Sequence, residues 1–310
     1  MIMKSMAGAK TAWIARQVGA KGAKERGTLL VFTHANGFCK EMWLPIWDLL
    51  IEQIDTERAP IDLLSLDLAG HGDSGPITKP LNIEEFGRNV LEAIDTFCAR
   101  TQASYDRIVG IGHSIGGSST LKAQLLRPVF TRVLLMEPIM SLPDEQGRFF
   151  RKDESDFVKS TLRRRNRFPD RKSAADNWRG KGAYKGWAPG MLELFVQHAM
   201  RETEDGSVEL KCEPASEAEA YADNNPILTE LHKVSCPAIV IGGSESWHMP
   251  KDKVEAFHKL YRYPGGFEIV PGGDHFLPMV DPEFFTKRIL ETFSFPTKAS
   301  TRLAPKVARL

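Results

Sequence analysis

Cysteine is scarce in this sequence, and the few residues present are scattered. Four cysteines occur in 310 residues, and none forms a Cys-x-x-Cys pair or a Cys/His ligand spacing. This pattern excludes a disulfide framework, predicts a reducing compartment and gives no basis for a metal site. We therefore expect neither a metal ion nor another cofactor.

Long apolar runs and an excess of one charge are also missing. No run approaches the roughly 20 residues that a membrane-spanning helix needs, so we expect no stable membrane insertion. The 41 Lys and Arg residues nearly cancel the 40 Asp and Glu residues. A near-neutral total gives no general electrostatic reason to expect nucleic acid as a partner.

Short apolar runs alternate with helical patterns along most of the chain. Continuous apolar strands between helices predict an α/β fold, with a mostly parallel central sheet covered by helices on both faces. The clearest helical patterns are Ile83–Arg100, with Asn82 as its N-cap, and Gly117–Leu126. The predicted strands are Leu29–Thr33, Ile61–Leu66, Arg107–Gly110, Arg132–Met136, Ala238–Ile241 and Phe267–Val270.

This alternation stops between about residues 141 and 226, where the chain is charged, rich in Arg and Trp, and helical in pattern. An insertion between two core strands would lie above their C-terminal ends, so we expect a helical lid over a pocket. The predicted domains are a core of residues 1–140 and 227–296, a lid of residues 141–226, and an exposed C-terminal tail of residues 297–310.

The run Gly112–Gly116 (GHSIG) has the G-x-S-x-G pattern of a nucleophile on a sharp strand-to-helix turn. An apolar strand precedes it and a helix of small residues follows, so Ser114 is the predicted nucleophile. Glycines beside the serine remove side chains that would clash in such a turn. The alternative is an ordinary glycine-rich turn between a strand and a helix.

A serine nucleophile needs a base, and His275 is the predicted one. It follows the last predicted strand, in the glycine-rich run Pro271–Phe276 (PGGDHF). Loops at strand ends are where reactive groups collect in such sheets. His258 lies in a polar helical pattern, which favours a solvated residue.

Two further runs carry a family resemblance. His34–Phe38 (HANGF) resembles the oxyanion loop of the α/β-hydrolase superfamily, and Asp67–Ser74 (DLAGHGDS) resembles its D-x-x-G-H-G-x-S loop. The resemblance covers nearly the whole core and implies the α/β-hydrolase fold. It also implies an oxyanion hole made by the backbone N–H of Ile115 and of Asn36, with Phe38 as a further candidate in this loop.

The acid that should orient His275 has two candidates. Most members of the superfamily place it about four residues before a proline, and here that position, before Pro250, holds Ser246; Glu245 is one residue away. A minority takes the acid from the end of the preceding strand, where Glu137 lies directly before Pro138. We favour Glu137 and keep Glu245 as the alternative.

The lid supplies candidates for substrate binding. Its arginines include Arg163 and Arg164, which form either a solvated helix face or a site for phosphates such as those of coenzyme A. The aromatic candidates for an apolar acyl pocket are Trp178, Trp187 and Trp247, together with Phe38; the alternative is that they form the core of the lid.

A narrower resemblance is to fungal peroxisomal acyl-CoA hydrolases of toxin and mycophenolate biosynthesis and their bacterial relatives. It implies hydrolysis of a carboxylic ester or an acyl-CoA thioester through an acyl-enzyme on Ser114. The alternatives are a lyase or C–C bond hydrolase with the same residues, and a non-catalytic binding protein. The final Ala308-Arg309-Leu310 is similar to the peroxisomal address Ser-Lys-Leu, which predicts an import receptor as partner and a peroxisomal location, with a cytoplasmic one as the alternative.

Overall fold

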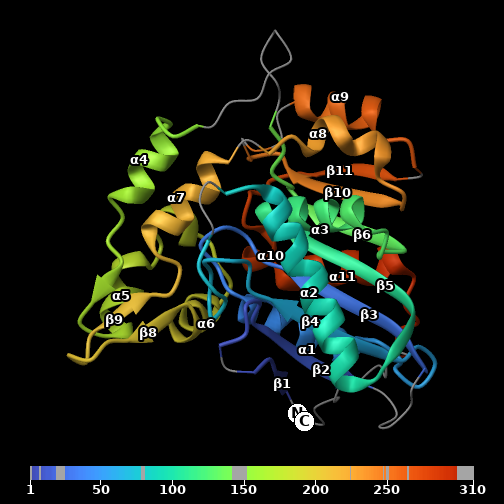
Figure 1. Ribbon diagram of the computed structural model, residues 1–310, viewed down its shortest axis with the longest axis horizontal. Coiled ribbons are helices and arrows are strands. Elements are labelled where there is room, and N and C mark those ends of the chain that lie inside the picture. The colour runs from blue at the N-terminus through green and yellow to red at the C-terminus, as the bar shows by residue number, and fades with distance from the viewer. Residues whose placement is uncertain are drawn as a thin grey trace, which may run out of the picture.

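The computed structural model describes residues 2–6, 8–18, 25–77, 81–141, 152–223, 225–246, 248, 251–263 and 265–298. A twisted eight-stranded sheet runs through the core in the order β1-β2-β4-β3-β5-β6-β10-β11 (Figure 1). The strands are β1 (Ile2–Lys4), β2 (Trp13–Val18), β3 (Glu25–Thr33), β4 (Ile61–Leu66), β5 (Ser104–His113), β6 (Arg132–Met136), β10 (Ala238–Gly243) and β11 (Gly266–Val270).

Only the β2 end of this sheet is antiparallel. Strand β2 pairs antiparallel with β1 and with β4, whereas every pairing from β4 to β11 is parallel. The predicted α/β fold with a mostly parallel sheet is therefore confirmed. Parallel pairing places the C-terminal ends of β3, β5, β6, β10 and β11 along one edge of the sheet.

Helices cover both faces of the sheet, which is why its central strands contain continuous apolar runs such as Leu29–Phe32. Along β3, Leu29 and Val31 belong to the hydrophobic core on one face, and Leu30 and Phe32 to the core on the other. The first face is covered by α2 (Ile83–Thr101), α3 (Ile115–Leu126), α8 (Ile227–Glu230) and α9 (Lys251–Leu260), and the second by α1 (Leu44–Gln53) and α11 (Pro282–Phe293). Short turns η1 (Lys40–Trp43), η3 (Leu231–Lys233) and α10 (Leu277–Val280) join these elements.

Helix α2 begins where the sequence predicts. The side chain of Asn82 accepts a hydrogen bond from the N–H of Glu84 at 2.9 Å, so it satisfies one of the donors that a helix N-terminus leaves free. No helix in the described ranges is both long and apolar enough to cross a membrane.

The segment between β6 and α8 forms a separate group of elements beside the sheet, drawn in green to yellow in Figure 1. The sequence predicts only helices in this segment, and the structure corrects this prediction: three short strands form a sheet in the order β7-β9-β8. Strands of two or three residues are too short to give a pattern of alternation in the sequence. The elements are α4 (Asp156–Leu162), β7 (Arg167–Phe168), α5 (Arg171–Trp178), η2 (Gly182–Tyr184), α6 (Met191–His198), β8 (Met200–Glu202), β9 (Val208–Leu210) and α7 (Pro214–Ala222).

We refer to residues 152–223 of this group as the lid. Its apolar side chains, such as Phe168, Trp178 and Phe195, form one hydrophobic cluster with Phe38, Met42 and Met279 of the rest of the protein. The division of the chain at residues 141 and 226, and the extent of the tail, remain predictions.

Candidate active site

Ser114 lies at the turn between β5 and α3, and its backbone is strained. Its φ of 57° and ψ of −122° fall in a region that residues with a side chain rarely adopt. The turn is held from both sides, since the N–H of Ser114 donates to the Met136 carbonyl at 2.9 Å and its carbonyl accepts from the N–H of Ile139 at 3.2 Å. Ser114 is therefore fixed against the end of β6, at the C-terminal edge of the sheet.

The glycines around Ser114 are required by close backbone approach. A Cβ atom on Gly116 would lie 2.5 Å from the carbonyl oxygens of both Thr33 and His34. A Cβ atom on Gly112 would lie 2.5 Å from the Cα of Gly117. Glycine alone allows α3 to start this close to the loop that follows β3.

Three side chains from different strand ends form a continuous chain of contacts. His275, in the loop between β11 and α10, has its Nε2 3.0 Å from the Oγ of Ser114 and its Nδ1 2.6 Å from the Oε2 of Glu137. All three residues are buried. The structure thus brings together the predicted nucleophile, base and favoured acid, whereas Glu245 is an exposed residue at the edge of the same cleft.

Glu137 itself is held by several donors. It follows β6 with a φ of 44°, and its backbone N–H donates to the Ile241 carbonyl at 2.8 Å. Its Oε1 accepts from the N–H of Gly243 at 2.7 Å, and its Oε2 also accepts from the hydroxyl of Ser246. Both oxygens of this fully buried carboxylate are therefore hydrogen bonded, as a buried charge requires.

Burial sets the protonation state of His275. Desolvation lowers the pKa of its imidazole to about 3, so the ring is neutral and able to accept a proton. The Nε2 of His113 donates to the carbonyl of His275 at 2.7 Å, and burial likewise lowers the pKa of His113 to about 3. The ring of His248 lies over that of His275, with centroids 3.8 Å apart. Contacts to the backbone carbonyl of His275, to both ring nitrogens and to one face of the ring thus fix the imidazole.

Asn36 lies beside Ser114 and is anchored by its side chain. Its Nδ2 donates to the carbonyl of Glu217 in the lid at 3.0 Å, and its Oδ1 lies 3.0 Å from the Nε2 of His71. Asn36 and Ser114 line the same cleft. Ile115 is the first residue of α3, where a backbone N–H has no acceptor within the helix.

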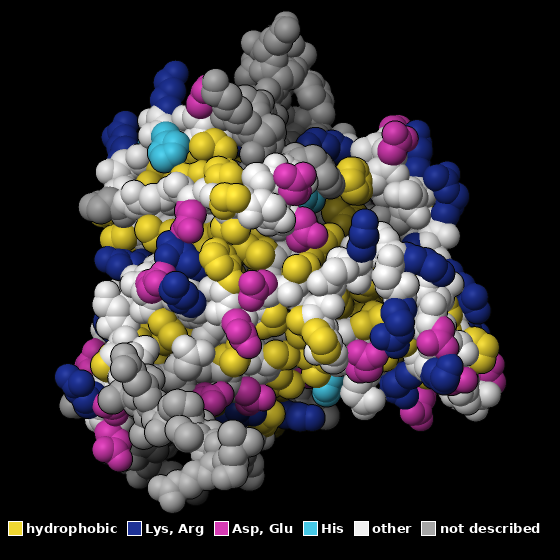
Figure 2. Space-filling model, turned by 180° about the vertical axis from the view of Figure 1, so that it is seen from behind, with side chains coloured by type: hydrophobic (Ala, Val, Ile, Leu, Met, Phe, Trp, Pro, Cys, Tyr) yellow, Lys and Arg dark blue, Asp and Glu magenta, His cyan; other side chains and the backbone are white. Residues whose placement is uncertain are grey.

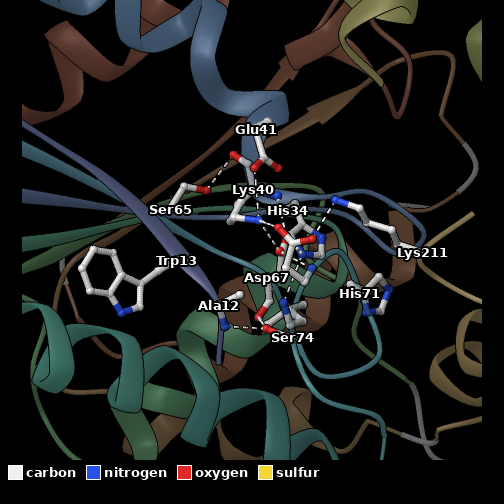
Figure 3. Close-up of polar contacts among 12 residues, drawn as sticks. Ala12, Trp13, His34, Lys40, Glu41, Ser65, Asp67, His71, Ser74 and Lys211 are labelled. Atoms are coloured by element: carbon white, nitrogen blue, oxygen red, sulfur yellow. Dashed lines mark hydrogen bonds and ion pairs between the residues drawn. The ribbon is translucent and has the colours of Figure 1, made fainter. Parts of the chain in front are cut away.

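A buried ionic network holds the loops behind this site (Figure 3). The Nζ of Lys40 lies 2.7 Å from carboxylate oxygens of both Asp67 and Asp73 and 3.1 Å from Glu41. Burial opposes the charged form, but the carboxylates of Asp67 and Glu41 outweigh it and raise the pKa of Lys40 well above its ordinary value. Lys211 of the lid donates to Asp73 at 2.7 Å, so the network also ties the lid to the core.

Lys40 and Asp67 connect the two loops that carry the family resemblance. The backbone N–H of Lys40 donates to Asp67 at 2.7 Å, and that of Asp73 donates to Asp67 at 2.8 Å. The Nε2 of His34 accepts from the N–H of Leu68 at 3.1 Å. These contacts fix the position of the loop that contains Asn36.

The cleft above Ser114 has a volume of about 680 Å³ and lies between core and lid. The core contributes Ser114, His248, His275 and Phe276, among others, and the lid contributes Phe157, Lys185 and Tyr221. These lid residues could not be predicted, because local sequence patterns do not determine where the lid lies relative to the sheet.

The predicted substrate-binding residues lie mostly elsewhere. Phe38, in the loop after β3, and Trp178 of the lid are buried in the hydrophobic cluster that the lid shares with the core, and Trp187 packs edge-on against Phe38 with centroids 5.4 Å apart. These three are absent from the described lining of the cleft. Trp247 lies outside the described residues, as does the Ala308-Arg309-Leu310 tripeptide.

Arg164 is already engaged within the lid. It forms an ion pair with Glu217 and donates to the hydroxyl of Tyr184 at 2.9 Å. Arg163 is exposed. Phosphate binding by these two arginines remains a prediction.

Other charges of the lid are paired as well. Among the described residues, Arg167 pairs with Asp205, Arg171 with Glu202 and Arg179 with Glu193, at 2.6 to 2.9 Å. Figure 2 shows Lys and Arg side chains interspersed with Asp and Glu on the lid side of the molecule. Within the described ranges, no group of three His, Cys, Asp or Glu side chains could hold a metal ion.

The order of the strands and the site at their C-terminal ends are those of a hydrolase fold. The sequence comparison points to the same class. Residues 30–288 match the alpha/beta hydrolase family, and the chain belongs to it. The proteins that it is similar to include relatives named as thioesterases, and the solved structures that it resembles share its fold.

The chain is similar to the type I acyl-CoA thioesterase mpaH of Penicillium brevicompactum, with 28% identity over 178 residues. The match covers 56% of this chain and 40% of the thioesterase, so it spans less than half of that relative.

Two solved structures illustrate the shared fold. The peroxisomal alpha-beta-hydrolase Lpx1 of Saccharomyces cerevisiae matches 98% of this chain and 92% of its own, with a TM-score of 0.77 and 19% identity. The thioesterase domain from the curacin biosynthetic pathway matches 94% of this chain and 99% of its own, with a TM-score of 0.69 and 16% identity.

Proposed function

We propose that this protein is a serine hydrolase that cleaves a carboxylic ester or an acyl-CoA thioester through an acyl-enzyme on Ser114. The observation that supports it most directly is the chain of contacts from Ser114 through His275 to Glu137. A hydroxyl, a neutral imidazole and a carboxylate in this order are what acyl transfer by a serine requires.

In the proposed reaction, the Oγ of Ser114 attacks the acyl carbonyl carbon while the Nε2 of His275 takes the hydroxyl proton. Glu137 stabilises the imidazolium that forms, and the backbone N–H groups of Ile115 and Asn36 donate to the oxyanion. His275 then returns the proton to the leaving alcohol or thiol. A water molecule, deprotonated by His275, then attacks the acyl carbon. The bond from this carbon to the Oγ of Ser114 breaks, His275 returns the proton to Oγ, and the acid leaves.

The acyl group and its carrier are assigned from the cleft and the relatives. The cleft presents the aromatic side chains of Phe157, Tyr221 and Phe276 near Ser114, which suits an apolar acyl group. Relatives are named acyl-CoA thioesterases, which favours a thioester. The phosphates of coenzyme A would contact the exposed cations at the lid, Lys185 and Arg163, since Arg164 is paired with Glu217.

The decisive experiment is Ser114→Ala. We expect loss of p-nitrophenyl ester turnover by roughly 10³-fold or more, loss of labelling by a fluorophosphonate probe, and an unchanged circular dichroism spectrum. Retained turnover or labelling would exclude Ser114 as the nucleophile. A panel of acyl-CoA thioesters, simple esters and diketones then separates hydrolysis of an ester or thioester from C–C bond cleavage.

For location, we propose import into peroxisomes through Ala308-Arg309-Leu310. The support is the tripeptide itself and the similarity to LPX1 of Saccharomyces cerevisiae, a protein named as peroxisomal. A fluorescent protein fused to the N-terminus should co-localise with a peroxisomal marker. The same fusion without the last three residues should stay in the cytosol; equal distribution of both fusions would contradict the proposal.

A further inference from the structure

We propose that Ser246 is a positioning residue that holds the carboxylate of Glu137 against His275. This inference rests on the proposed function, and it concerns a residue that sequence reasoning set aside. Ser246 occupies the place from which most α/β-hydrolases are expected to supply their acid, four residues before Pro250. Here that place holds a hydroxyl in contact with an acid that comes from a different strand.

The contact is specific in its geometry. The Oγ of Ser246 lies 2.5 Å from the Oε2 of Glu137, which is the same oxygen that lies 2.6 Å from the Nδ1 of His275. Because the carboxylate accepts, the hydroxyl of Ser246 must be the donor. The proton of Ser246 and that of the imidazole therefore converge on one oxygen and fix its direction.

The hydroxyl of Ser246 is itself oriented. It accepts a hydrogen bond from the backbone N–H of His248 at 3.2 Å, which leaves its proton for Glu137. The other carboxylate oxygen accepts from the N–H of Gly243, at the end of β10. Glu137 is thus clamped between the end of β10 and the loop that follows it.

Such a clamp is needed because Glu137 reaches its position with a positive φ and a longer side chain than aspartate has. An unrestrained glutamate has one more rotatable bond to order, and any rotation moves Oε2 away from the imidazole. Hydrogen bonds to a charged acceptor are stronger than neutral ones, so the Ser246 hydroxyl and the Gly243 N–H together hold the rotamer.

The first test is Ser246→Ala. Loss of one hydrogen bond to a charged group predicts a fall in kcat of about tenfold. The change in KM should be smaller, because Ser246→Ala removes one oxygen from the cleft lining and leaves its aromatic side chains in place. Ser246→Thr, which keeps a hydroxyl, should retain most of the activity. The matched control is Ser244→Ala, in the same loop. The hydroxyl that it removes contacts Glu245 and the Gly272 N–H but not Glu137.

The second test moves the acid. In the Glu137→Gln background, Ser246→Asp supplies a carboxylate, one bond longer than the serine side chain, at the position that contacts the Glu137 side chain. We expect this double variant to recover at least tenfold in kcat over Glu137→Gln alone. No recovery, together with a kcat for Ser246→Ala within twofold of the parent, would overturn the inference.

A third measurement is independent of turnover. The Nδ1–H proton of His275, shared with a carboxylate, should give a low-field resonance in the proton NMR spectrum, and that resonance should be absent in Glu137→Gln. Ser246→Ala should shift or broaden it, whereas Ser244→Ala should leave it in place. If the parent protein cleaves no ester or thioester and the resonance still responds to Ser246→Ala, the proposed function fails and the positioning role stands; an unmoved resonance counts against the role.

Discussion

The Oε2 of Glu137 lies 2.6 Å from the Nδ1 of His275, across 138 positions of sequence. The two side chains meet because β6, β10 and β11 are neighbouring parallel strands. The loops that follow β6 and β11 therefore lie at the same end of the strands, separated only by β10. Glu245, at the end of the intervening strand, is nearer in sequence but is exposed.

This arrangement predicts different outcomes for the two carboxylates. Glu137→Gln should lower kcat by roughly 10³–10⁴-fold, because the amide cannot stabilise an imidazolium and favours the wrong tautomer of His275. Glu245→Gln should stay within a few-fold of the parent. Steady-state kinetics with a p-nitrophenyl ester measures both. A large fall in the Glu245 variant alone would make Glu245 the acid.

The crowded start of α3 predicts a packing defect. Gly116→Ala places a Cβ atom 2.5 Å from two backbone oxygens, so backbone must shift. We expect a loss of about 1–3 kcal/mol in the free energy of unfolding and a marked fall in kcat, since Thr33 and His34 lead into the Asn36 loop. Gly266→Ala is the control: its nearest neighbour is a side-chain carbon at 3.5 Å. Similar destabilisation in both variants would contradict this explanation.

The buried network around Lys40 predicts a large cost when one partner is removed. Lys40→Met leaves Asp67 buried with its charge uncompensated, which should lower the free energy of unfolding by about 3–5 kcal/mol. Arg88→Met breaks an exposed ion pair with Glu84 and should change the free energy of unfolding by about 0.5 kcal/mol or less. Urea titration of the two variants distinguishes these values.

Buried histidines predict a loss of stability in mild acid. Burial lowers the pKa of His34 to about 4 and the pKa values of His71 and His113 to about 3, all below the ordinary 6.5. The unfolded chain therefore binds more protons than the folded one below about pH 6.5, and stability is complete above that pH and falls as pH decreases toward 4. Each histidine contributes a slope of up to about 1.4 kcal/mol per pH unit.

Urea unfolding at pH 7.5, 6.5 and 5.5 measures this slope. His71→Gln should reduce this slope by the contribution of about one proton. His232→Gln, at an exposed position, is the control and should leave the slope unchanged. A parent protein whose stability is flat from pH 7.5 to 5.5 would show that these histidines are not neutral in the folded state.

The sheet could be predicted because its strands are buried on both faces, which makes runs such as Leu29–Thr33 and Ala238–Ile241 continuously apolar. The strands of the lid could not, because Arg167–Phe168 and Val208–Leu210 are too short to show a pattern. Their pairing depends on contacts between residues about 40 positions apart, which local propensity does not encode.

The same limit applies at the site. The turn at Ser114 has a local signature, since the G-x-S-x-G pattern lies within five residues, although Gly116 is required by its close approach to Thr33 and His34. The contact between Ser246 and Glu137 has none, because it depends on how two loops from neighbouring strands meet. The spacing of the aromatic residues Trp178 and Trp187 is more typical of the interior of a lid than of a pocket, and only the three-dimensional path of the chain separates these uses.

Taking the acid from β6 has a consequence for how such a protein can diverge. The loop after β10 borders the cleft through Glu245 and His248, yet Glu137, whose carboxylate contacts His275, follows another strand. Under the proposed mechanism, replacement of Glu245 alters the charge that a substrate meets and leaves the contacts among Ser114, His275 and Glu137 in place. Natural variation in this one position can change substrate preference while the chemistry of the site is inherited intact.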